Sequence, residues 1–292
     1  MDNVLKEFLT AKTADGLAES TMRDYRMVLG RFCDALTLDQ LSRATVRQYV
    51  ADLRTDNGWS EGTIGIHIRY IRAFLRWLHI EGYTARNYAL AIKAPKKAVR
   101  WDELLTHAEI KQLLQAASKG KFPERDKAII LFLMDTGIRR GEFFLLKRDQ
   151  VRENGDNRLY LQFDAPKTGD KRFCILGRTT ARALRAYLAT RTDADPALWY
   201  GEQGPYQYSA MYRMLRRHAK TAGIDPSRVH PHVFRKIFAT WWIKNGGDEQ
   251  RLMALGGWNG PEMLRIYVQL GNLEDLLDGH ADYSPVDNFA DD

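Results

Sequence analysis

Apolar side chains recur at helical spacing through most of this 292-residue chain. Three such stretches lie in the first ninety residues, and the clearest of them spans residues 63–81 and ends at Gly82. Only two runs, residues 158–163 and 172–176, have the character of short strands, and a turn joins them. Beyond them the spacing is helical again. The pattern therefore predicts a mainly α protein with one small antiparallel sheet.

A proline and a basic cluster interrupt the helical spacing at residues 94–100, which indicates a junction between two domains. Thr106 and Glu109 then form a capping-box pattern that begins a new helix. The expected boundaries are 1–94 for a helical domain, 95–104 for a basic linker, 105–270 for a mixed α/β but mostly helical domain, and 271–292 for an acidic tail.

The formal net charge of +7 is unevenly distributed. Seven of the 37 acidic residues follow Arg265, so the rest of the chain has 44 basic residues against 30 acidic ones. This surplus suits a polyanionic partner, and it would equally keep a protein with another role in solution.

Cys33 and Cys174 are the two cysteines, and no metal-ligand spacing accompanies them, so we expect a reduced protein whose thiols are buried or inert. The chain does not start with a charged segment followed by an apolar one, and no apolar run is long enough to span a bilayer. These features predict a cytoplasmic protein without membrane insertion.

Four short motifs follow one another over about half of the chain. In order they are Thr136-Gly-Ile-Arg-Arg-Gly-Glu142, Pro166-Lys-Thr-Gly-Asp-Lys-Arg172, His232-Val-Phe-Arg235, and Leu255-Gly-Gly-Trp258 with Tyr267 beyond it. Together they resemble the signature boxes of the tyrosine recombinase or phage integrase family, whose members cut and rejoin DNA. The first ninety residues likewise resemble that family's core-binding domain. The resemblance implies a DNA-clamping first domain and a catalytic second domain of the DNA breaking-rejoining type.

The resemblance assigns roles to seven residues. The catalytic positions are Arg139, Lys167, His232, Arg235, Trp258 and Tyr267, with Glu142 in support. Arg139 and Arg235 would clamp phosphate oxygens, because a guanidinium is planar, permanently charged and able to donate two parallel hydrogen bonds. The neighbouring Lys171 and Arg172 are rivals of Lys167 by proximity.

Tyr267 would attack the phosphorus atom. With a reference pKa near 10, only about one phenol in a thousand is ionised at neutral pH, so a base is required. His232 is the best candidate to accept the phenolic proton or to bond a phosphate oxygen. Lys167, on the turn, would protonate the departing 5′ oxygen. Most relatives resemble one another in having histidine where Trp258 stands; an indole N–H can hold a phosphate oxygen but cannot shuttle a proton.

Basic residues on two predicted helices and in the linker are candidates for contacts to DNA. They are Arg69, Arg72, Arg76, Lys96, Lys97, Arg213, Arg216, Arg217 and Lys220. Those on the helices fall at spacings that place them on stripes able to follow a phosphate backbone. The alternative is a set of solvated helix faces whose arginines meet nearby acids.

The function implied by the resemblance is that of a site-specific DNA recombinase or integrase acting through a 3′-phosphotyrosyl intermediate, with no cofactor, metal or ATP. His230 and His232 form a pair without a third ligand or a carboxylate cluster, so no metal site is expected. The expected partners are a double-stranded recombination site and further copies of the chain in a tetramer on DNA, with accessory proteins left open. The acidic tail would pack on a neighbouring protomer or on its own domain. The alternatives are a type IB topoisomerase and a DNA-binding protein that does not cut.

Overall fold

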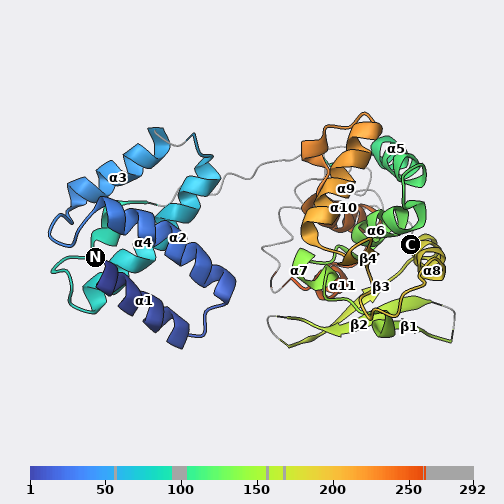
Figure 1. Ribbon diagram of the computed structural model, residues 1–292, viewed down its shortest axis with the longest axis horizontal. Helices are drawn as coiled ribbons and strands as arrows, with labels where there is room; N and C mark the ends of the chain where they lie inside the picture. Colours follow the sequence, from blue (N-terminus) through green and yellow to red (C-terminus); the bar gives the residue numbers. More distant parts are fainter. Residues whose placement is uncertain (56–57, 94–103, 156–157, 167–168, 259, 261–292) are drawn as a thin grey trace, which may run out of the picture. The chain divides into compact units, whose positions relative to one another are not determined.

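The computed structural model describes residues 1–55, 58–93, 104–155, 158–166, 169–258 and 260. The chain divides into two compact units, Met1–Arg100 and Trp101–Asp292, each with its own hydrophobic core. Figure 1 shows the first unit as packed helices and the second as a group of helices with a small sheet at one edge. The expected mainly α fold is confirmed.

The described part of the first unit is built from helices. Its elements are α1 (Asp2–Ala14), α2 (Glu19–Ala35), α3 (Arg43–Thr55), α4 (Glu61–Ile80) and the short 3-10 helix η1 (Tyr88–Ala91). Their apolar faces meet around Phe8, whose ring makes edge-to-face contacts with Tyr25 and Phe74, each at 5.2 Å between ring centroids. Burying one such ring stabilises the fold by about 1.5–3 kcal/mol.

The helix α4 confirms the one predicted at residues 63–81. It begins slightly earlier because Ser60 is its N-cap, whose Oγ accepts a hydrogen bond from the backbone N–H of Thr63 at 3.2 Å. It ends just before Gly82, which has a left-handed backbone with φ +78°. One face of α4 is buried in the core, and the other carries the predicted arginine stripe.

The described part of the second unit contains more helices and strands than that of the first. Its elements are α5 (His107–Ser118), α6 (Pro123–Thr136), α7 (Arg140–Phe143), η2 (Arg148–Gln150), β1 (Val151–Glu153), β2 (Leu159–Asp164), β3 (Lys171–Ile175), α8 (Arg178–Ala189), β4 (Tyr200–Gly201), β5 (Gly204–Pro205), α9 (Tyr208–Thr221), η3 (Pro226–Arg228), α10 (Pro231–Lys244) and α11 (Glu249–Gly256). The apolar α6 packs against α5, α8 and α10, so it is the centre of this unit.

The capping box predicted at the start of α5 is confirmed. Oγ1 of Thr106 accepts a hydrogen bond from the backbone N–H of Glu109 at 3.1 Å, and Oε2 of Glu109 accepts one from the backbone N–H of Thr106 at 2.8 Å. Two backbone donors that the helix cannot satisfy are thereby bonded.

The sheet is larger than predicted. The predicted pair of strands corresponds to β2 and β3, but β1 adds a third antiparallel strand beside β2, and β4 pairs with β5 in a separate hairpin. Runs of two or three residues are too short to show an alternation of side chains, so the sequence did not reveal these strands.

The strand β3 alternates between exposed and buried side chains. Lys171, Phe173 and Ile175 are exposed, whereas Arg172 and Cys174 point inward. A strand sends successive side chains to opposite faces, so this register directs an arginine into the interior of the second unit.

Both cysteines are buried and neither forms a disulfide. The expected burial is confirmed, and it raises the pKa of the Cys33 thiol to about 11 and that of Cys174 to about 12. Within the described ranges, no helix is both long enough and apolar enough to cross a membrane.

Candidate active site

The C-terminal end of α6 determines where Arg139 lies. The helix stops at Gly137, which has a left-handed backbone with φ +54° and packs so closely on Phe238 that a Cβ atom would lie 2.9 Å from Cγ of that ring. Two residues later Arg139 is the N-cap residue of α7. Its side chain is 44% exposed, so the guanidinium is accessible to a ligand.

The carboxylate of Glu142, one turn into α7, is buried and accepts three hydrogen bonds. Oε2 accepts from the backbone N–H of Arg139 at 3.1 Å, and Oε1 accepts from Nη1 of Arg139 and from Nη1 of Arg172, each at 3.0 Å. A single anion therefore orients two arginines that lie 33 positions apart in the chain.

The side chain of Arg172 is almost completely buried. Its Nη2 donates to the carbonyl oxygen of Leu255 at 2.7 Å, while its Nε is buried and has no hydrogen-bond partner in the described part of the chain. Burying a guanidinium with an unsatisfied N–H costs free energy, so the position is occupied by arginine in spite of a penalty to stability.

Arg235 on α10 is also buried, and it joins two chain segments. Its Nη1 donates to the carbonyl oxygen of Gly137 at 2.5 Å, and its Nη2 donates to that of Gly256 at 2.7 Å. The guanidinium carbon lies 4.0 Å from the ring centroid of Trp258, in the geometry of a cation–π contact. The end of α6 and the end of α11 are held together through this side chain.

These three arginines, which we call the arginine cluster, bind three consecutive backbone carbonyls. Arg172 bonds to Leu255, Arg235 to Gly256 and Arg139 to Gly257. Those residues form the C-terminal end of α11, where carbonyl groups lack helical partners and the helix dipole is negative. The cluster bears three positive charges and is bonded to one carboxylate, so it can attract a further anion.

Gly257 makes this arrangement possible because it has no side chain. Its backbone is left-handed with φ +65°, and a Cβ atom there would overlap Nη1 of Arg172 and lie 2.7 Å from Nη1 of Arg139. The next residue, Trp258, is buried in a small apolar group that includes Phe238 and Leu252. The indole predicted to bind phosphate thus lies beside the arginine cluster, against Arg235.

The two histidines of the second motif differ in their surroundings. His230 is the N-cap of α10, and its Nδ1 accepts a hydrogen bond from the backbone N–H of Val233 at 3.2 Å. His232 lies in the first turn of α10 and is exposed. Since Arg235 follows three positions later, His232 and Arg235 project from the same side of the helix.

The structure brings together five of the residues singled out from the sequence. Arg139, Glu142, Arg235 and Trp258 meet at the arginine cluster, and His232 lies one turn from Arg235. Four others lie outside the described residues, namely Lys167, Tyr267, Lys96 and Lys97. The catalytic roles of all these residues stay predictions.

Sequence reasoning missed Arg172, which it treated only as a rival of Lys167. The available signal was its position in the strand: it alternates in phase with Cys174 and Leu176, which are buried apolar residues. An arginine on the inward face of a strand needs a buried partner, and Glu142 is that partner.

The arginine stripe on α4 is accessible. Arg69 and Arg76 are exposed and Arg72 is half-buried. None of the three forms an ion pair with an acidic residue within the described ranges, so the alternative of acid-paired arginines finds no support there. Their contact with DNA stays a prediction.

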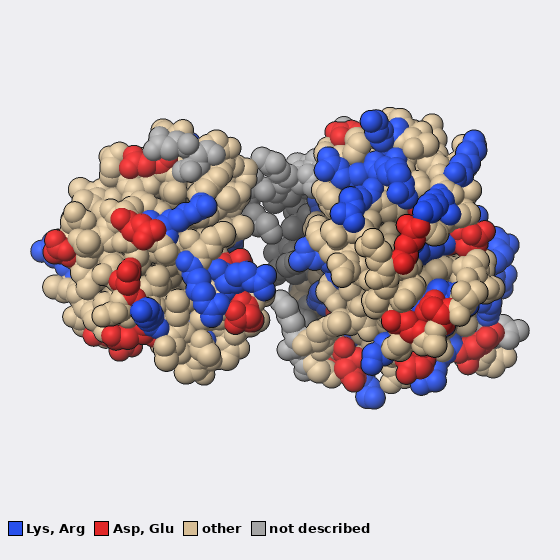
Figure 2. Space-filling view, viewed as in Figure 1, with Lys and Arg blue, Asp and Glu red and all other residues tan. Residues whose placement is uncertain are grey.

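The basic stripe on α9 is divided between two sides of the helix. Arg213 and Arg217, four positions apart, line one pocket, whereas Arg216 lies over the ring of Tyr212 at 5.5 Å and is not among the lining residues. Lys220 is exposed. Figure 2 shows lysine and arginine side chains gathered over the part of the second unit where α9 lies.

Solved structures of recombinases share this fold. A lambda integrase dimer bound to a COC′ core site has a TM-score of 0.76 and 18% sequence identity, over 91% of this chain and 94% of that one. XerH recombinase in a post-cleavage complex with difH has a TM-score of 0.74 and 16% identity, over 96% of this chain and 84% of that one. The fold is therefore that of the DNA recombinases.

Sequence comparison leads to the family. Residues 103–273 match the model of the phage integrase family, and residues 4–93 match the N-terminal SAM-like domain of phage integrases. Tyrosine recombinase XerA of Pyrococcus furiosus is 27% identical over 277 residues, which cover 91% of this chain and 89% of that protein. Tyrosine recombinase XerC of Alcanivorax borkumensis is 29% identical over 232 residues, which cover 76% and 74%.

The chain belongs to the phage integrase family, and it is a site-specific DNA recombinase of the tyrosine type. The family and the activity expected from the sequence motifs are confirmed. The topoisomerase and the non-cutting DNA-binding protein are not favoured.

Proposed function

We propose that this recombinase cuts DNA by attack of Tyr267 on a phosphodiester held by the arginine cluster. The observation that carries the proposal is the convergence of Arg139, Arg172 and Arg235 on residues 255–257. Tyr267 follows that segment by ten positions in the sequence. The segment that leads to Tyr267 in the sequence therefore begins at residues 255–257, to which the three arginines are bonded.

The proposed reaction is a transesterification. The phenolic oxygen of Tyr267 forms a bond to phosphorus, the bond from phosphorus to the 5′ oxygen breaks, and a 3′-phosphotyrosyl link results. The phenolic proton passes to His232, and the departing 5′ oxygen takes a proton from Lys167. A 5′-hydroxyl of another strand reverses the step, so the energy of the phosphodiester is conserved in the covalent link.

The arginines would supply charge stabilisation. Arg139 and Arg235 would donate to the two non-bridging oxygens, whose negative charge grows during attack. Both guanidinium groups are already fixed, Arg139 by Glu142 and Arg235 by Gly137 and Trp258, so little reorganisation is required on binding. Arg172 would act as a positioning residue, since it is bonded to the same carboxylate as Arg139 and to the segment before Trp258.

The proposed partner is double-stranded DNA that contains a recombination site. Integrase and recombinase neighbours of this fold are described as bound to DNA. The exposed arginines on α4 and α9 would contact the phosphate backbone. We further propose a tetramer on DNA in which the tail, residues 271–292, packs on a neighbouring protomer. Accessory proteins would act on this tetramer.

The first experiment tests cutting. The purified protein is incubated in EDTA with a nicked suicide duplex, and a denaturation-resistant protein–DNA adduct is measured for the wild type, for Tyr267→Phe and for Tyr160→Phe on β2 as a matched control. The wild type and Tyr160→Phe should form the adduct, and Tyr267→Phe should not. Equal adduct from Tyr267→Phe, or shifted DNA without any adduct from the wild type, would overturn the proposal.

A second experiment tests the fate of the cut strand. Two labelled duplexes are mixed with the protein, and exchange of strands between them is compared with relaxation of a supercoiled plasmid. Strand exchange is the expected result. Relaxation without exchange would favour the topoisomerase reaction.

A further inference from the structure

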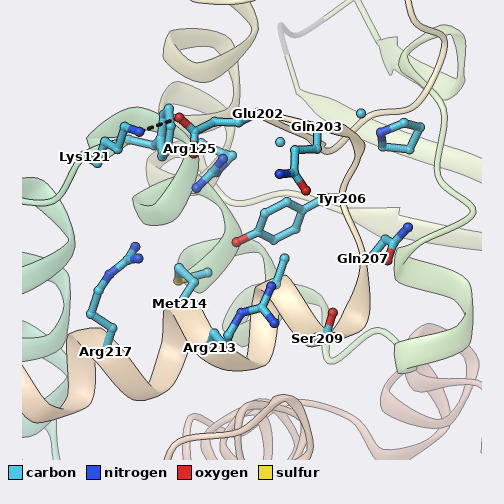
Figure 3. Close-up of a pocket in the computed structure, with 15 residues that line it drawn as sticks. Lys121, Arg125, Glu202, Gln203, Tyr206, Gln207, Ser209, Arg213, Met214 and Arg217 are labelled. Carbon is cyan, nitrogen blue, oxygen red and sulfur yellow. Dashed lines mark hydrogen bonds and ion pairs between the residues drawn. The ribbon is translucent and has the colours of Figure 1, made fainter.

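A pocket of about 370 Å³ opens on the second unit beside α9. Its walls are the side of α9 that carries Arg213 and Arg217, the start of α6 with the turn before it, and the β4–β5 hairpin (Figure 3). None of the three residues of the arginine cluster lines it. The charged and phenolic side chains that line it are those of Lys121, Arg125, Glu202, Tyr206, Arg213 and Arg217.

The ionised side chains that line this pocket are mostly cationic. The lining includes four cationic side chains, those of Lys121, Arg125, Arg213 and Arg217. It includes one carboxylate, that of Glu202. Lys121 bonds to Glu202, and both side chains are exposed at the rim, so this pair screens its own charges. Three guanidinium groups remain.

One carboxylate beneath the pocket balances part of this charge. Asp126 is completely buried; its Oδ1 accepts from Nη2 of Arg125 at 2.8 Å, and its Oδ2 accepts from Nη2 of Arg217 at 3.3 Å. The ring nitrogen Nε2 of His218 lies 2.8 Å from the same Oδ2. Arg213 forms no ion pair with any described residue. The pocket therefore keeps an excess of positive charge.

Arg125 is held rigidly at the floor. Its guanidinium carbon lies 4.2 Å from the ring centroid of Phe122 and 4.7 Å from that of Tyr206, and its Nε and Nη2 both bond to Asp126. The Nη1 group makes no hydrogen bond within the described part of the chain, and it is not fully buried. A planar donor fixed in this way loses little side-chain freedom when it binds an oxyanion.

Tyr206 adds a neutral donor. Figure 3 shows its hydroxyl directed into the pocket, on the side where Arg125, Arg213 and Met214 lie. Burial raises the pKa of the phenol to about 12, so the hydroxyl keeps its proton at neutral pH and can donate it in a hydrogen bond. No described residue accepts that hydrogen bond.

We propose that this pocket binds a phosphate group, through the Nη1 group of Arg125, the guanidinium of Arg213 and the hydroxyl of Tyr206. One guanidinium held in place, a second that is exposed and a phenol together supply hydrogen-bond donors that suit a tetrahedral oxyanion. The phosphate belongs either to the backbone of bound DNA, away from the scissile position, or to a free phosphate compound. The first source rests on the proposed DNA binding, and the second is independent of it.

The first arm of the test uses free anions and the full chain. Binding of pyrophosphate is measured by calorimetry for the wild type, Arg213→Gln, Tyr206→Phe and the control Arg182→Gln, which removes an exposed charge from α8. If the pocket takes free phosphate compounds, Arg213→Gln and Tyr206→Phe bind at least about tenfold more weakly, and Arg182→Gln binds as the wild type does. Acetate at the same concentration should not compete.

The second arm uses DNA. The affinity for a duplex is measured against salt concentration for the same four proteins. If the pocket holds a backbone phosphate, the slope of log K against log salt is less steep by about 0.9 in Arg213→Gln than in Arg182→Gln, because one counterion-releasing contact is lost. Tyr206→Phe weakens duplex binding without a change of slope, since a neutral donor releases no counterion.

Weaker binding, or a changed salt dependence, that is specific to the Arg213 and Tyr206 variants in either arm supports phosphate binding in the pocket. The arm in which it occurs identifies the source of the phosphate. Pocket variants that behave like Arg182→Gln in both arms would overturn the inference. The adduct assay on the wild type separates the proposed cutting by Tyr267 from the proposed phosphate binding. A wild type that forms no adduct would contradict the cutting, whatever the pocket binds.

Discussion

Arg139 and Arg172 donate to the same carboxylate oxygen, Oε1 of Glu142, and each does so at 3.0 Å. One of these arginines is at the start of a short helix and the other is on a strand, so the shared anion joins two elements of the second unit. The other guanidinium nitrogen of each arginine bonds to a carbonyl at the end of α11. Glu142 is therefore the centre of the cluster, and its charge orients residues on both sides.

Replacing Glu142 by glutamine should impair both stability and cutting. The amide has the shape of the carboxylate but no charge, so the buried Arg172 loses its counterion, at a cost of about 2 kcal/mol in the free energy of unfolding. Urea unfolding and the adduct assay measure the two effects. Glu124→Gln, at an exposed position on α6, is the control and should change neither; an unchanged adduct yield from Glu142→Gln would contradict the proposed role.

Replacing Arg172 by lysine should slow adduct formation by about tenfold to a hundredfold, with duplex affinity nearly unchanged. An ammonium cannot reach Glu142 and Leu255 with two separate fixed donors, so Arg139 and the segment before Trp258 lose their alignment. Single-turnover kinetics on the suicide duplex give the rate. Arg158→Lys, at an exposed position beside β2, should behave as the wild type.

A neutral substrate tests whether Arg172 acts on phosphate charge or only on stability. The scissile phosphate is replaced by a methylphosphonate, which removes the negative charge that the arginines stabilise. The defect of Arg172→Lys should shrink on this substrate, because the lost alignment of Arg139 then matters less. A defect of the same size on both substrates would indicate a purely structural residue.

Replacing Gly257 by alanine should abolish adduct formation. A Cβ atom at this position would overlap Nη1 of Arg172 and crowd that of Arg139, and it would also strain a left-handed backbone by about 1–2 kcal/mol. Gly246→Ala is a matched control, because Gly246 has φ +74° with no atom within 4 Å of the added Cβ. Both variants should lose similar stability through the backbone, and only Gly257→Ala should lose the adduct.

The first unit should become less stable as the pH falls below about 6.5. His67 is buried against Trp59, and burial, aided by the charge of Arg31, lowers the pKa of its imidazole from the ordinary value of 6.5. The folded pKa is below the unfolded one, so the unfolded chain binds more protons between the two values, and stability present above pH 6.5 is lost as the pH falls through the folded pKa. Hydrogen exchange of α4 amides, corrected for intrinsic rates, measures the loss.

The variant His67→Phe should remove this pH dependence, because phenylalanine does not titrate. His79→Gln, on the same helix at an exposed position, should keep it. If the protection of the α4 amides from hydrogen exchange has the same pH dependence in the wild type and in His67→Phe, a group other than His67 is responsible.

The amino-acid sequence was sufficient for the features that depend on neighbouring residues. Helical spacing predicted α4, and the pattern of Thr106 with Glu109 predicted the start of α5, because hydrogen bonds and side-chain periodicity within one turn are local. It did not reveal β1 or the β4–β5 hairpin, which are too short for periodicity. The motifs pointed to Arg139, Glu142 and Arg235, yet said nothing of what these side chains touch.

The sequence by itself determined the family, the local elements and the residue types of the reaction. The tertiary structure alone decided that Arg172 belongs with Arg139, that three arginines bind consecutive carbonyls, and that Arg213 and Arg217 line one pocket above the buried Asp126. Such contacts join residues many positions apart, and they arise only when a buried charge must find an opposite charge or a carbonyl within the packed interior.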